Sequence, residues 1–101
     1  MPFELSLPAA MSNGGWKVKI RDKERNEPPH VTIISGTRAW RWGLREQNWL
    51  DKEPPGREVP ADVVAFVKAN LAELISAWDS KYPENPVTSV GGNDANRKPG
   101  S

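Results

Sequence analysis

The chain has 101 residues, which suffices for one small domain and is too short for a second hydrophobic core. Its formal net charge at pH 7 is +1, from 14 Lys and Arg against 13 Asp and Glu, so overall charge does not indicate a nucleic-acid-binding protein. There is no Cys, which excludes disulfides, thiolate metal sites and cysteine nucleophiles.

Location follows from the same composition. A chain without Cys fits a reducing compartment, and the first 15 residues have neither the basic start nor the apolar run of a secretory signal. No window reaches the ~20 consecutive apolar residues that a membrane helix requires. We therefore expect a cytoplasmic protein that does not enter a membrane, present as a monomer or a weak dimer.

Residues 1–15 have only a weak pattern. Phe3, Leu5 and Leu7 alternate with polar residues, which suits a short edge strand, but Pro8 would end it and Gly14 and Gly15 would make a flexible joint. We predict a weakly structured N-terminal segment over 1–15.

The first clear strand pattern lies in residues 16–21, where apolar and cationic side chains alternate. This period of two is typical of a sheet with one buried and one exposed face. The apolar members are Trp16, Val18 and Ile20, and the cations are Lys17, Lys19 and Arg21. The cations either line an ordinary solvated face or form a stripe that contacts phosphates.

Two further strands are predicted around a glycine. Pro28 and Pro29 hold the chain extended at the entrance to a β-branched strand over 31–35. Gly36 permits a tight turn, and residues 37–44 return as the third strand, with Arg38, Trp40, Trp42 and Leu44 on one face. Residues 45–50 suit a shorter fourth strand with Trp49 packed inward, and 51–58 read as a loop.

One long helix is predicted after this loop. Pro60 suits a first helical position, and Tyr82 before Pro83 suits the end. Between them one stripe of the helix is apolar, which indicates a single buried face. The stripe consists of Val63, Val64, Val67, Leu71, Leu74, Ile75, Trp78 and Tyr82.

These elements predict an α+β fold. It is an antiparallel meander of three to four strands, with the helix packed on one face of the sheet. The single domain spans 16–82, and 83–101 is predicted to be a disordered tail because it is dense in Gly, Pro and Asn without periodicity.

His30 is the only imidazole, so any serine–histidine triad would depend on it, and no nucleophile motif supports one. One His with carboxylates has no recognisable zinc spacing, and no nucleotide-binding or HExxH motif is present, so we predict neither metal nor cofactor. His30 either has a capping or packing role, or is a general acid–base or a hydrogen-bond donor to a phosphate, flanked by Arg38 and Arg41 across the hairpin. An enzyme of this kind would be a metal-independent ribonuclease.

Five Trp residues in a short chain raise the possibility of an aromatic platform for bases or sugars. Trp16, Trp49 and Trp78 fit the core better, because they lie on apolar faces or beside Leu50. Arg38 is expected at the wet edge of its strand, stacked on Trp40.

The segment Pro28-Pro29-His30-Val31 resembles the signature of the domain-of-unknown-function family numbered 4160. Residues 70–78 (NLAELISAW) are similar to the closing helix of that family, and the resemblance covers 16–82. Members are small bacterial proteins that resemble toxin-like components encoded beside a small helix-containing partner. The resemblance therefore implies the same α+β fold and a partner protein encoded nearby.

This chain departs from the family in two places. Thr32 stands where many members carry a second His, and a Trp-rich return strand replaces an acidic, aliphatic one. Two functions stay open. The first is a toxin-like RNA binder that uses Lys17, Lys19, Arg21, Arg38 and Arg41 on phosphates. The second is a non-catalytic protein–protein interaction module.

Overall fold

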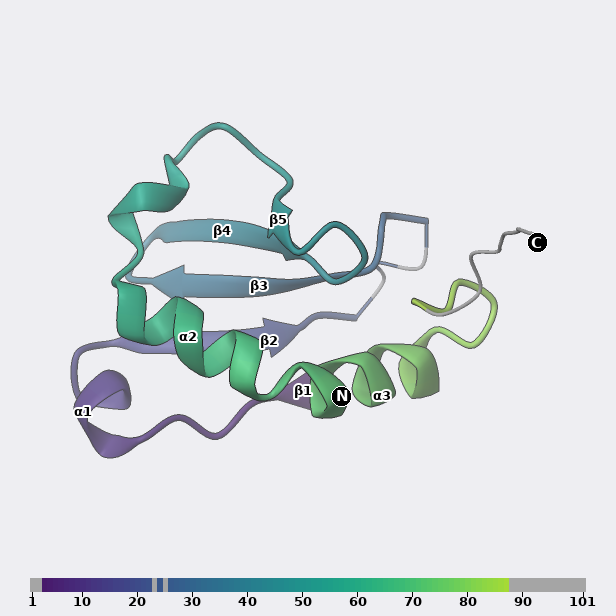
Figure 1. Cartoon of the computed structure of the whole chain (residues 1–101), viewed down its shortest axis with the longest axis horizontal. Helices are drawn as coiled ribbons and strands as arrows, with labels where there is room; N and C mark the ends of the chain where they lie inside the picture. Colours follow the sequence, from purple (N-terminus) through teal and green to yellow (C-terminus); the bar gives the residue numbers. More distant parts are fainter. Residues whose placement is uncertain (1–2, 23, 25, 88–101) are drawn as a thin grey trace.

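A five-stranded antiparallel sheet forms the centre of the computed structural model, which describes residues 3–22, 24 and 26–87. Each strand pairs with the next one along the chain, so the sheet is a meander (Figure 1). The strands are β1 (Phe3–Glu4), β2 (Trp16–Ile20), β3 (His30–Ser35), β4 (Arg38–Gly43) and β5 (Asn48–Trp49).

The predicted α+β class and antiparallel meander are confirmed, but the sheet has five strands rather than three or four. The additional pairing comes from β1, and β5 is the short strand expected within 45–50. Strand β1 lies in the segment where the alternation of Phe3, Leu5 and Leu7 suited a short edge strand, although 1–15 was predicted to be weakly structured. Gly36 has φ of +60° and stands in the turn between β3 and β4, as predicted.

The predicted single long helix is wrong in detail, because the segment forms two helices. These are α2 (Ala61–Ala69) and α3 (Leu71–Lys81), separated at Asn70. The Asn70 side-chain amide donates to the Phe66 carbonyl at 2.8 Å, in competition with the backbone donor of the helix. Asn70 has φ of −109° and ψ of 22°, outside the helical region, so the helix is interrupted there.

Two short helical turns were not predicted. Helix α1 (Ala9–Ser12) begins after Pro8, and the 3-10 turn η1 (Gly56–Glu58) lies in the loop after β5. Each turn is too short to show a helical period.

The core lies between the sheet and one side of α2 and α3, which cross the same face of the sheet (Figure 1). Trp78 is completely buried, as its predicted place in the helical stripe requires. Trp40 and Trp42 are buried on the same sheet face as Val31 and Ile33, because the strand register places them directly opposite these residues. Sheet pairing and helix packing thus bury one sheet face.

Packed residues also occur on both sides of the predicted 16–82 domain. Leu5 is buried, and so is Val87, whose N–H donates to Asp79 Oδ1 at 2.6 Å. The predicted disorder of residues 88–101 lies outside the described part of the chain. No helix among the described residues is long and apolar enough to cross a membrane.

Candidate functional site

His30 opens β3, and its side chain is completely buried. Its ring lies 5.5 Å from the ring of Trp78, so the C-terminal half of α3 covers it. The helix also fixes the loop before β3: the Tyr82 hydroxyl accepts from the Glu24 N–H at 2.9 Å and donates to the Arg21 carbonyl. Packing of α3 against the start of β3 therefore buries the histidine that sequence analysis proposed as a site.

The hydrogen bonds of His30 favour its protonated form. Nδ1 lies 2.8 Å from the Pro28 carbonyl, which can only accept, so Nδ1 carries a proton. Nε2 lies 3.2 Å from Glu24 Oε2, to which it donates when the ring is protonated at both nitrogens. Burial alone lowers the pKa of His30, but its hydrogen bonds to Glu24 and Pro28 and the charges of Glu24 and Glu27 outweigh this and raise it. Protonated His30 therefore forms a buried ion pair with Glu24.

Arg41 lies near His30 but is held by other partners. Its guanidinium binds both carboxylate oxygens of Asp51, at 2.8 and 2.7 Å, and donates to Glu27 Oε1 at 3.1 Å. The hydrogen bond to Asp51 raises the pKa of Arg41, and the same bond lowers the pKa of Asp51. The register places Arg41 opposite Thr32 and Arg38 opposite Ser35, at the end of the hairpin away from His30, so only one of the two predicted Arg lies near the imidazole.

The structure does not gather the five predicted phosphate-binding cations into one surface. Lys17, Lys19 and Arg41 share the sheet face opposite α2 and α3, where Lys19 and Arg41 flank Thr32 in one row. Arg38 lies on the other face, and Arg21 follows the end of β2.

Three of these cations have carboxylate partners. Lys19 pairs with Glu4 at 4.0 Å, Arg41 with Asp51, and Arg38 with Glu58. Arg38 also lies 5.3 Å from the centroid of the Trp40 ring, as predicted. Within the described chain, Lys17 and Arg21 have side chains without an ion pair.

One group of side chains could hold a cation. Glu24, Glu27 and His30 each offer a ligand atom, and these atoms lie within 4.8 Å of one another. A cation there would have to displace the contact of Glu24 with His30 Nε2 and that of Glu27 with the Arg41 guanidinium. Sequence analysis missed both Glu residues. The available signal was that Glu24, Glu27 and His30 follow one another at intervals of three residues.

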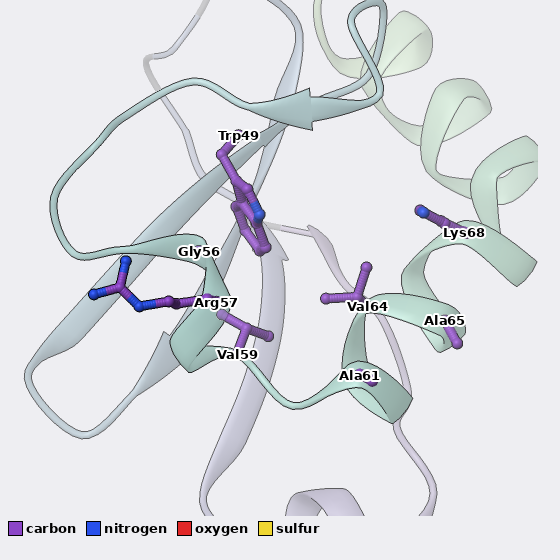
Figure 2. A pocket seen from close by; sticks show the side chains of 8 residues that line it. All are labelled: Trp49, Gly56, Arg57, Val59, Ala61, Val64, Ala65 and Lys68. Atoms are coloured by element: carbon purple, nitrogen blue, oxygen red, sulfur yellow. The ribbon is translucent and has the colours of Figure 1, made fainter.

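A pocket of about 540 Å³ opens between β5, η1 and α2 (Figure 2). This volume lies within the roughly 300–1,000 Å³ typical of ligand sites. Its lining is apolar or small apart from two cations, and no carboxylate contributes. The lining residues are Trp49, Gly56, Arg57, Val59, Ala61, Val64, Ala65 and Lys68.

Local sequence explains both walls. On one side, the indole of Trp49 lies directly against Gly56, where a Cβ would overlap the ring. On the other side, Ala61, Val64, Ala65 and Lys68 recur at the spacing of one helical face, and the two Ala leave room. We call this site the Trp49 pocket.

The two cations of the Trp49 pocket differ in direction. In Figure 2 the Lys68 ammonium points toward Trp49, whereas the Arg57 guanidinium points away from the pocket. The Lys68 ammonium also lies 5.6 Å from the ring of Trp42, which meets Trp49 edge-on at 5.0 Å. Neither cation forms an ion pair with a described residue. Sequence analysis missed this pocket because its walls come from three elements, and only the spacing along the helix was visible.

No protein-family model matches this sequence, and no curated protein or solved structure is significantly similar to it. The resemblance to the family numbered 4160 therefore stays a prediction that rests on two short motifs.

Proposed function

We propose that the protein is a non-catalytic interaction module that binds another protein at the Trp49 pocket. The observation that carries the proposal is that the two side chains a ribonuclease would use, His30 and Arg41, are both occupied by contacts within the protein. His30 is completely buried in an ion pair, and Arg41 is held by two carboxylates. A substrate would have to break these contacts before either group could act.

The Trp49 pocket offers what the His30 region lacks. Trp49 is half-buried with its ring at the pocket wall, and Lys68 is exposed and free of carboxylate partners among the described residues. A half-exposed aromatic side chain beside small apolar residues is typical of protein-binding surfaces.

The resemblance to the family numbered 4160 supports a particular partner. If it holds, a neighbouring gene encodes the partner, and the protein is a toxin-like component of a pair. We also propose a cytoplasmic location and a monomer or weak dimer on its own. The two-residue edge strands support a monomer or weak dimer, because short edge strands limit pairing between the sheets of two molecules.

The test is co-expression with the products of the neighbouring genes, followed by light scattering of the purified sample. We expect a 1:1 complex with one of them. Ala65→Phe fills the pocket and should abolish the complex, whereas Ala72→Phe, at an exposed position of α3 outside the pocket, should leave it intact. Failure of every neighbouring product to bind would overturn the proposal.

RNA binding is the second candidate, favoured by the presence of Lys17, Lys19 and Arg41 on one sheet face. It has less support because Lys19 and Arg41 already bind carboxylates, and the buried or packed Trp residues lie on the opposite face. Binding of labelled mixed-sequence RNA should be measured at about 50 and about 200 mM salt, with cleavage followed on a gel. Salt-sensitive binding that Lys17→Glu weakens would favour this candidate.

A further inference from the structure

The feature that carries a further inference is the chemistry of the Trp49 pocket. We propose that the pocket takes a large apolar side chain of the partner, flanked by a carboxylate that pairs with Lys68. This inference rests on the proposed function and names the chemistry of the partner at that site.

The shape of the pocket supports an apolar side chain. Gly56 and Ala61 contribute almost no side-chain volume, and the ring of Trp49 and the side chain of Val64 face the space between them (Figure 2). A Cβ on Gly56 would push the Trp49 ring out of its place, so the width of the pocket depends on this glycine. An aromatic or branched apolar side chain fits these walls because it can contact the Trp49 ring and the helix at once.

The charge of the pocket supports an acidic neighbour. Its lining contains two cations and no anion, and Lys68 is the one whose ammonium is directed toward Trp49. No described carboxylate neutralises it. A carboxylate next to the inserted side chain would therefore meet an unpaired ammonium, whereas a cationic segment would be repelled.

The same geometry makes Arg57 an internal control. It has the same charge as Lys68 and also lines the pocket, but its guanidinium points away. Replacement of Arg57 should therefore weaken only the long-range electrostatic attraction of an acidic peptide and leave the ion pair of its carboxylate with Lys68 in place.

The test uses three acetylated and amidated peptides and the full chain labelled with ¹⁵N. The first has one Phe between two pairs of Glu, the second has Lys in place of Glu, and the third has Ser in place of Phe. The five indole N–H signals are observed in proton–nitrogen correlation spectra, with that of Trp49 assigned by Trp49→Phe. We expect the first peptide to shift the Trp49 signal and those of the Lys68 backbone, with little effect of the other two.

Variants then locate the contact. Lys68→Ala should weaken binding of the acidic peptide about two- to fivefold and Lys68→Glu about tenfold, whereas Arg57→Ala should change it less than twofold. Equal shifts by the acidic and the basic peptide, or equal effects of Lys68→Ala and Arg57→Ala, would overturn the inference.

The outcomes separate this inference from the proposed function. If a neighbouring gene product binds and filling the pocket abolishes that complex, but the acidic peptide does not bind, the chemistry proposed here is wrong and the interaction module stands. If the acidic peptide binds and no neighbouring gene product does, the pocket recognises the chemistry but the proposed function fails. Self-association that broadens the Trp49 signal as concentration rises would identify a second copy as the occupant and overturn the inference.

Discussion

At the His30 end of the sheet, the side chains of His30 and Arg41 lie against carboxylates, whereas at the Trp49 pocket two cations have no carboxylate partner among the described residues. His30 and Arg41 bind Glu24, Glu27 and Asp51 in a region covered by the end of α3. Lys68 instead lies over the ring of Trp42 beside an open pocket. The side chains best suited to catalysis, His30 and Arg41, are therefore occupied by contacts within the fold. The charge of the surface residue Lys68, by contrast, remains accessible to a binding partner.

The largest effect should come from removing the side chain that closes the His30 end. Trp78 is completely buried, and its indole N–H donates to the Asn85 carbonyl at 2.7 Å. Trp78→Ala should lower the free energy of unfolding by about 3–5 kcal/mol, which can unfold so small a domain. Urea unfolding followed by circular dichroism measures it. A midpoint equal to that of the parent would contradict the packing of α3 described here.

A smaller effect should follow from breaking the buried ion pair. In Glu24→Gln the side chain keeps its shape but loses its charge, so His30 loses the partner that holds its second proton. We expect a loss of about 1–3 kcal/mol at neutral pH. Glu46→Gln, at an exposed position, is the matched control and should cost almost nothing. Equal losses in the two variants would show that the ion pair contributes no stability.

The same ion pair should make stability depend on pH. Because folding raises the pKa of His30 above its ordinary value of 6.5, its contribution is fully present below about pH 6.5. The contribution is lost as pH rises through the raised pKa of the folded state. Urea unfolding of the parent from pH 6 upward should show this decline, and Glu24→Gln should show a smaller one. Identical pH profiles for the two proteins would rule out His30 as the titrating group.

Gly56→Ala tests the pocket side of the comparison. The added methyl group would overlap the Trp49 indole, which is half-buried and can move outward. We expect a loss of only about 1 kcal/mol, at the low end for overpacking, together with a shift of the Trp49 indole N–H signal. An unchanged signal would mean that Gly56 does not set the position of the ring.

The smallest effect should come from truncation after Val87. Residues up to Val87 are anchored, since Arg45 donates to the Val87 carbonyl at 3.2 Å and Val87 itself is buried. Removal of 88–101 should therefore leave the melting temperature within about two degrees of the parent. Truncation after Pro83, which also removes Asn85 and Val87, should lower it clearly. A large loss from the shorter deletion would show that residues beyond Val87 contribute to the fold.

Local sequence patterns were sufficient to predict the three central strands and the buried stripe of the helices. Alternation in β2 and the turn at Gly36 depend on neighbours in the chain, and the 3.6-residue period selected Trp78 as an anchor, so local patterns were sufficient for them. The break at Asn70 is local too, but its signal is one side-chain hydrogen bond rather than a repeat, and a periodic analysis does not register it.

Which charged side chains are free to contact a partner depends on the tertiary structure. Arg41 and Asp51 are ten residues apart in sequence, and Trp78, which packs against His30, belongs to the C-terminal helix α3. The Trp49 pocket likewise combines β5, η1 and α2. An ion pair or a cavity depends on distances in space that residue spacing along the chain does not fix. His30, which sequence analysis proposed as a site, is therefore buried in the structure, and the partly exposed Arg41 is held by carboxylates.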